Sequence, residues 1–81
     1  MTQLSACREP GMVRVIRMDL GMGALLHLQS LGLRPGMLVR VVRPTRWRGP
    51  VTLSCMGTDV AVGRGVAERI WVEACGEEQE A

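Results

Sequence analysis

Apolar residues alternate with polar ones in five short segments of this chain, and this two-residue period is typical of strands that bury one face. The inward positions would be Val13 and Val15, Val39 and Val41, Val51, Leu53 and Cys55, Val60 and Val62, and Ile70 and Val72. The sequence has two Trp and neither Phe nor Tyr, so aliphatic side chains must supply the core. Branched aliphatic residues favour pleated sheet over helix. We therefore predict an all-β protein.

Glycine and proline separate the expected strands. In Arg34-Pro35-Gly36, proline presets φ for the second turn position and glycine accepts the positive φ of the third. Pro44 is expected to end the strand over residues 37–43, because it has no N–H to donate. Gly57-Thr58 is expected to turn the chain between the two strands of a hairpin.

One short helix is predicted between the first and second strands. Leu25, Leu28 and Leu31 recur at a spacing of three residues, as on one face of a helix over residues 23–31. Gly32 stands where a helix end favours a residue that can adopt a positive φ. Residues 64–69 are expected to hold one helical turn at most.

The chain of 81 residues is predicted to form a single domain. Its core would span about residues 11–74, with a polar lead-in before it and a frayed tail after it. Exposed edge strands carry unpaired N–H and C=O groups, which a stable monomer must limit. Closure of the five short strands into a small barrel removes most of these edges, so a barrel is the expected architecture. Size and strand count both fit an SH3-like barrel of five strands with one short helix, which we expect to be monomeric.

Charge is distributed unevenly along the chain. All ten basic residues are Arg, and the formal net charge is only +2. No acid lies between Asp19 and Asp59, whereas the chain beyond Glu73 is acidic. The acid-free stretch contains five arginines: Arg34, Arg40, Arg43, Arg46 and Arg48. We therefore predict one basic edge and an acidic C-terminal segment.

A basic edge raises the alternative of a nucleic-acid-binding barrel. Proteins that bind single strands stack bases on several aromatic side chains, and this chain offers only Trp47 and Trp71. We therefore do not expect nucleic acid as a partner. No apolar run approaches the roughly 20 residues of a membrane span, and no signal-peptide pattern precedes the first strand. A cytoplasmic protein is the expectation.

The residues that commonly bind metals or perform catalysis are few and scattered. His27 is the only histidine, and the three cysteines are an odd number at wide spacing, which favours reduced thiols and predicts no cofactor. The weak candidates for an adventitious Fe²⁺ or Zn²⁺ site are His27 and Cys7. No nucleophile stands beside a base and no phosphate-binding loop occurs, so we predict that the chain is not an enzyme.

The best candidate for contact with a partner is the basic loop around Trp47, which is flanked by Arg46 and Arg48. Trp and Arg are enriched at the energetic centres of interfaces. The alternative is that Trp47 folds back and caps one open end of the barrel. Arg43, just before this loop, is a further candidate. Leu26, on the helix face opposite Leu28, defines a second candidate surface together with Met22. The favoured alternative is that these apolar side chains only cover the sheet and contact no partner.

The stretch from Leu28 to Glu73 resembles FeoA, the small partner of the bacterial ferrous-iron transporter FeoB. The pattern L-x-x-L-G-L-x-P-G, a strand, a G-x-P hairpin and A-x-x-I-x-V is matched at these positions: Leu28, Leu31, Gly32, Leu33, Pro35, Gly36, Gly49, Pro50, Ala67, Ile70 and Val72. With the first strand included, the similarity covers residues 11–74. Gly63-Arg64-Gly65 is richer in glycine than this pattern, which leaves the detail of the last connection open.

The resemblance implies a cytosolic SH3-like module that docks on FeoB and supports Fe²⁺ uptake without chemistry of its own. The same barrel forms the C-terminal domain of DtxR-like iron-dependent repressors, so a stand-alone relative of that domain is the alternative. No helix-turn-helix pattern precedes the first strand, and a free-standing FeoA is therefore the better match.

Overall fold

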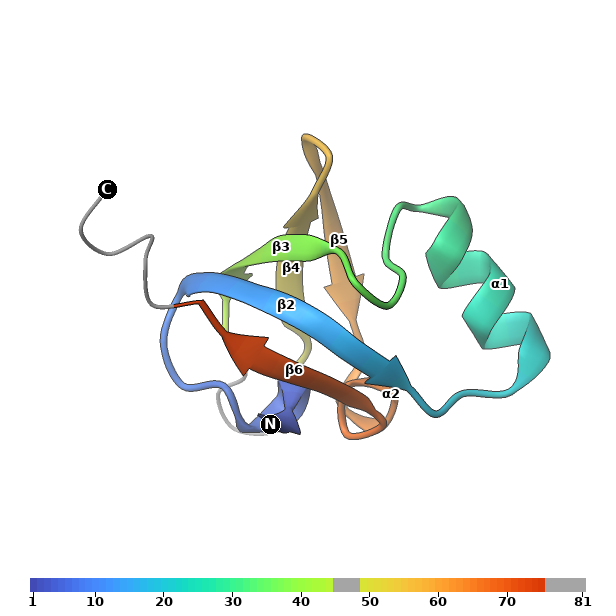
Figure 1. The fold of residues 1–81 in the computed structure, drawn as a ribbon, viewed down its shortest axis with the longest axis horizontal. Coiled ribbons are helices and arrows are strands. Elements are labelled where there is room, and N and C mark those ends of the chain that lie inside the picture. Colours follow the sequence, from blue (N-terminus) through green and yellow to red (C-terminus); the bar gives the residue numbers. More distant parts are fainter. Residues whose placement is uncertain (45–48, 76–81) are drawn as a thin grey trace.

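The computed structural model describes residues 1–44 and 49–75. Within these ranges the fold is a six-stranded antiparallel sheet in the order β1-β6-β2-β3-β4-β5 (Figure 1). The strands are β1 (Thr2–Gln3), β2 (Gly11–Met18), β3 (Leu38–Arg43), β4 (Val51–Cys55), β5 (Thr58–Val62) and β6 (Ile70–Ala74). The helices are the 3₁₀ turn η1 (Leu4–Ala6), α1 (Met22–Ser30) and the single turn α2 (Arg64–Ala67). The all-β prediction is confirmed.

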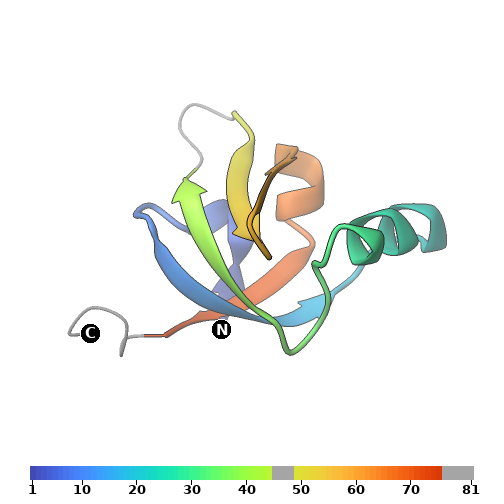
Figure 2. The ribbon, with the colours of Figure 1, turned by 90° about the horizontal axis from the view of Figure 1, so that it is seen from above.

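Two β-bulges bend the sheet into an SH3-like barrel. The register of β2 against β6 shifts between Val15 and Arg17, and that of β3 against β4 shifts between Val41 and Arg43. An extra residue on one strand of a pair bends that strand and increases its twist. Figure 2 shows the resulting curl, in which β2 and β6 cross beneath β3, β4 and β5. The bulge in β2 also changes which residues face inward, so that Met18 is buried after Val15.

The interior of the barrel is apolar. Among the described residues, none that is buried is polar or charged. The predicted inward positions are confirmed, since all of them are at least nine-tenths buried, whereas Leu38, Arg40 and Val42 face outward. The largest fully buried side chains include Leu33, Leu53 and Ile70.

Helix α1 begins and ends one residue earlier than predicted, and its buried face is the predicted one. Leu28 is buried, and Leu25 and Leu31 pack against the core cluster. The helix ends in a Schellman motif, in which Gly32 N–H donates to the Gln29 carbonyl and Leu33 N–H donates to the Leu28 carbonyl, each at 3.0 Å. Gly32 adopts φ 97°, as this position requires. Both ribbon views place α1 at one side of the barrel, outside the sheet (Figures 1 and 2).

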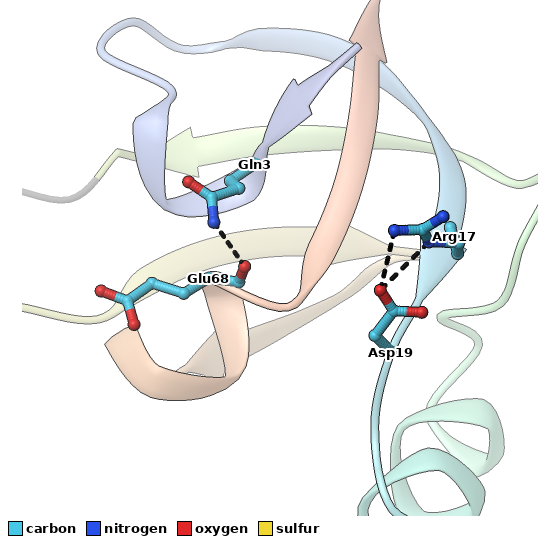
Figure 3. Close-up of polar contacts among 4 residues, drawn as sticks. All are labelled: Gln3, Arg17, Asp19 and Glu68. Atoms are coloured by element: carbon cyan, nitrogen blue, oxygen red, sulfur yellow. Dashed lines mark hydrogen bonds and ion pairs between the residues drawn. The ribbon is translucent and has the colours of Figure 1, made fainter.

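The N-terminal residues do not form the flexible lead-in that the sequence suggests. Thr2 pairs with Val72 and Gln3 with Trp71, so β1 adds a sixth strand at the edge of β6. Gln3 Nε2 also donates to the Glu68 carbonyl at 2.8 Å (Figure 3). Leu4 follows and is fully buried. The apolar residues near the N-terminus do not alternate with a two-residue period, so local pattern does not predict this strand.

The turn between β4 and β5 lies one residue earlier than predicted. Its two central residues are Met56 and Gly57, with φ of 52° and 83°. Two successive residues at positive φ are characteristic of a type I′ hairpin turn, which favours Asn-Gly. Met is uncommon in this conformation, which explains why the sequence pattern missed it. The Met56 side chain is 79% exposed, and its Sδ would lie 3.1 Å from a Cβ placed on Gly32.

Replacing Leu4 tests whether the N-terminal segment is part of the core. We expect Leu4→Ala to lower the free energy of unfolding by about 2–5 kcal/mol, because it leaves a cavity in the packed interior. The matched control is Leu26→Ala, at a 56% exposed position, which should change stability by less than about 0.5 kcal/mol. Urea unfolding followed by circular dichroism measures both, and equal stabilities would show that Leu4 is not packed.

A second pair of variants tests the hairpin turn. Met56→Asn should raise the free energy of unfolding by roughly 0.5–1 kcal/mol, because Asn tolerates a positive φ better than Met does. Gly57→Ala should lower it by about 1 kcal/mol for the opposite reason. If thermal unfolding shows that Met56→Asn is destabilised instead, the packing of the Met56 side chain outweighs the backbone strain.

Candidate functional site

One open hollow lies at the end of the barrel where β2 begins and β3 ends. Its volume is about 510 Å³. Its described lining residues come from the segment before β2, the end of β3 and the start of β4: Arg8, Pro10, Val42, Arg43, Pro44, Gly49, Pro50 and Thr52. Three of them are prolines, which cannot donate a ladder hydrogen bond and so stop strand pairing. The end of the barrel therefore stays open, and we call this site the basic hollow.

Two arginines give the basic hollow its charge. Arg8 and Arg43 are both exposed and line it from different parts of the chain. Its described wall contains no acidic residue, and neither guanidinium forms an ion pair with any residue that the structure describes. Val42 and the prolines supply apolar walls between the two charges. The site therefore suits a ligand that combines negative charge with apolar contact.

Of the predicted partner-contact residues that the structure describes, Arg43 lines this hollow and Leu26 does not. Arg46, Trp47 and Arg48 lie outside the described residues, so their role stays a prediction. The sequence analysis missed Arg8 and Pro10, because it treated the N-terminal segment as a flexible lead-in. The available signal was Pro10-Gly11, a rigid pair placed directly before a strand that pairs with β3.

Leu26 lies on a different surface, as both ribbon views place α1 and the end of β3 on opposite sides of the barrel (Figures 1 and 2). Leu26 is 56% and Met22 68% exposed, on the face of α1 that turns away from the core. An apolar groove of about 190 Å³ runs between α1 and the edge strand β5, lined by Leu28, Leu31 and Val62 among others. The predicted contact residues therefore define two separate surfaces.

The two candidate metal ligands are not brought together. His27 is exposed on α1 and lines the apolar groove. Cys7 is half-buried near the N-terminus and lines another hollow together with Glu9. That hollow adjoins the basic hollow, because Arg8 and Pro10 line both. In residues 1–44 and 49–75, no three side chains of the His, Cys, Asp and Glu types gather closely enough to hold a metal ion. All three cysteines are free thiols.

Trp71 is the tryptophan that the structure describes, and its ring is partly covered. The Arg17 guanidinium lies 5.7 Å from the ring centroid, within the range of a cation–π contact. The same guanidinium pairs with Asp19 at 2.9 Å (Figure 3). Both charged side chains of this pair are about half exposed, so it contributes little to stability. Trp71 is therefore not a free platform for stacking bases.

Comparison with known proteins gives a consistent result. The family model of the FeoA domain matches residues 2–74. A Methanocaldococcus jannaschii protein provisionally named Fe(2+) transport protein A is 38% identical over 73 residues, which are 90% of this chain and 87% of that protein. A crystal structure of an iron uptake regulatory protein (FeoA) is 30% identical with a TM-score of 0.80, and the match covers 91% of this chain and 97% of that one.

Other solved structures share the fold at lower identity. The solution structure of the FeoA protein from Chlorobium tepidum has a TM-score of 0.82 at 24% identity, over 93% of this chain and 71% of that one. The Zn²⁺-bound structure of ScaR, a manganese-activated repressor, has a TM-score of 0.81 at 21% identity. That match covers 93% of this chain and only 37% of ScaR, so the chain corresponds to one part of the repressor.

Fold and surface together define a small SH3-like barrel with an apolar interior and with hollows on its outside. The family match extends from β1 to the end of β6. The chain belongs to the FeoA domain family. Within the part of the chain described, no helix combines the length and apolar character needed to span a bilayer.

The buried thiols predict an alkaline limit to stability. Burial raises the pKa of Cys7 and of Cys55 above the ordinary value of 9.0, because the protein interior disfavours the thiolate. The unfolded chain therefore loses these protons at lower pH than the folded protein does. Their contribution to stability should be complete below pH 9.0 and lost as the pH rises through the folded-state pKa values.

The loss of stability at alkaline pH can be assigned to thiols because few other side chains of this chain titrate at alkaline pH. The sequence has no Tyr, and all its basic residues are Arg. Urea unfolding between about pH 8 and pH 11 should show a falling free energy of unfolding. The double variant Cys7→Ala/Cys55→Ala should show a flatter slope, whatever its absolute stability. An unchanged slope would contradict the role of these thiols.

Proposed function

We propose that this chain is a cytoplasmic accessory protein of ferrous-iron uptake that acts by binding the cytosolic part of an FeoB-like transporter. The observation that carries the proposal is the FeoA domain match over residues 2–74. Two relatives support it through their names, one for Fe(2+) transport and one for iron uptake regulation. The relative named for Fe(2+) transport matches over 87% of its own length, so the likeness is to a whole small protein rather than to an appended domain.

Binding, rather than catalysis, is the mode of action that the barrel supports best. Its buried described residues are all apolar, so a partner must be recognised on the outer surface. The basic hollow and the apolar groove are open on that surface, and Pro, Val, Leu and Arg make up most of their described lining. These are groups that contact and orient a partner, whereas general acid–base chemistry requires paired titratable groups held in one site.

The proposed transporter-binding surface consists of the basic hollow together with residues 46–48 of the sequence. Arg43 lines the hollow, and the loop residues Arg46, Trp47 and Arg48 follow it directly in the chain. The exposed Leu26 on α1 is a second proposed contact, which the fold separates from the first. A partner that uses one surface need not touch the other, so variants at the two places can be compared within one experiment.

Trp47→Ala is the variant that tests the proposal. An interface anchor typically costs 2 kcal/mol or more when truncated, so we expect the affinity for the transporter's purified cytosolic domain to fall by about 30-fold. Isothermal titration calorimetry measures the affinity, and the thermal midpoint should stay nearly unchanged. Leu26→Ala, measured in parallel, reports on the second surface.

The outcomes separate the alternatives. A large loss of thermal stability in Trp47→Ala would assign Trp47 to capping the barrel. Loss of affinity in Leu26→Ala alone would move the interface to α1. If the native chain does not bind the cytosolic domain, and its deletion leaves Fe²⁺ uptake by cells unchanged, the proposed function is wrong.

A further inference from the structure

The three middle strands of the sheet form a surface of their own on the outside of the barrel. β2, β3 and β4 are neighbours in the sheet, so the residues that alternate with their buried positions share one side of it. Arg14 is opposite Leu38, and Arg40 is opposite Ser54. Figure 1 shows β2 and β3 side by side, with α1 at one side of the barrel. We call this surface the outer face, and it consists of Arg14, Leu38, Arg40, Val42, Thr52 and Ser54.

The strands that form the outer face are basic. β2 has two arginines and β3 has two, whereas β2, β3 and β4 contain no acidic residue. Arg14 Nη1 donates to the Gly36 carbonyl at 3.0 Å, which holds its guanidinium beside the turn that begins at Arg34. Arg34 is exposed as well. Neither Arg14 nor Arg40 forms an ion pair with any residue that the structure describes.

Acidic residues lie at the borders of the outer face and not at its centre. Glu73 is opposite Arg14 on β6, and Asp59 is opposite Ser54 on β5. Neither acid forms an ion pair with an arginine of the face. The centre of the face therefore keeps its positive charge, and it attracts an anionic partner.

Exposed apolar side chains alternate with the charge along β3. Leu38 is 42% and Val42 is 36% exposed, and Arg40 lies between them on the same side of the strand. Outward residues that are two positions apart on a strand are separated by about 7 Å. The outer face therefore offers cationic and aliphatic groups side by side, at the spacing of neighbouring side chains.

This composition favours a lipid surface over a protein or a nucleic acid. The energetic centres of protein interfaces are enriched in Trp, Tyr and Arg, whereas Leu, Val, Ser and Thr are under-represented there. The uncharged residues of the outer face are of these four under-represented types. β2, β3 and β4 contain no aromatic residue on which a base could stack. An anionic bilayer presents negative headgroups above an apolar layer, which suits arginine and aliphatic side chains together.

We propose that the outer face binds the surface of an anionic lipid bilayer, with its arginines at the headgroups and Leu38 and Val42 at the boundary of the acyl chains. The inference goes beyond the proposed function, which brings the chain to the cytosolic side of a membrane transporter. The cytoplasmic leaflet there carries anionic lipids. The contact is weak and reversible, because few arginines and two half-exposed aliphatic side chains form it. It keeps the barrel close to the membrane.

The experiment is co-sedimentation of the native chain with lipid vesicles in the absence of the transporter. One set of vesicles contains phosphatidylcholine mixed with phosphatidylserine, and the other contains phosphatidylcholine alone. We expect the chain to bind the first set and not the second. Adding NaCl to about 1 M, where the screening length is near 3 Å, should release it.

Two pairs of variants locate the contact on the outer face. Arg40→Gln should lower the partition coefficient onto the anionic vesicles about fivefold, which is the effect of one arginine near such a surface. Its matched control is Arg69→Gln, which removes the same charge from an exposed position between α2 and β6 and should change the coefficient less than about twofold. Leu38→Ala should lower the coefficient about threefold, and Leu26→Ala on α1 should leave it unchanged. Circular dichroism checks that each variant is folded.

Several outcomes would overturn the proposal. Absence of binding to the anionic vesicles is one, and equal binding to pure phosphatidylcholine is another. Equal effects of Arg40→Gln and Arg69→Gln would show attraction by net charge without a defined face. If Arg40→Gln leaves vesicle binding unchanged and weakens binding to the transporter's cytosolic domain, the outer face belongs to a protein interface. Because the vesicles contain no transporter, failure in the vesicle experiment is distinct from failure of the proposed function.

Discussion

The structure depends on one shared aliphatic interior that strands from the whole length of the chain must fill together. No strand could be stable alone, because each of the five longer strands contributes only two or three buried side chains and β1 contributes none. The two β-bulges allow the strands to close around this common core. They bend β2 and β3 enough for the inner faces of these strands to meet those of β4, β5 and β6. Because the interior holds no buried polar group in the described part, specificity is left to the outside.

Most of the barrel could be predicted from local sequence pattern. Apolar residues at alternate positions, such as Val39 and Val41 or Val51 and Leu53, predict which face of a strand is buried, and these residues are buried. Helix α1 was predicted within one residue at each end, because its leucine spacing and the glycine after it act over a few neighbouring residues. The turn at Pro35-Gly36 is likewise local, and Gly36 has φ 92°.

The features that the pattern missed are set by distant residues. Strand β1 has only two residues, and its pairing is provided by Val72 and Trp71 at the other end of the chain. The bulge in β2 leaves no mark in composition, since Ile16 fits an unbroken strand equally well. The basic hollow joins Arg8 to Arg43 across more than thirty positions of sequence. Such proximity is produced by the tertiary fold and is invisible in any window of neighbouring residues.

The use of arginine for both charges on the described wall of the hollow has a consequence for the shape of the anion that fits there. A guanidinium is planar and holds its five N–H donors in a fixed fork, which matches the two oxygens of a carboxylate or a phosphate, whereas a lysine ammonium acts as a point charge. The wall therefore favours a flat or forked oxyanion that can accept two parallel hydrogen bonds over a compact anion of equal charge.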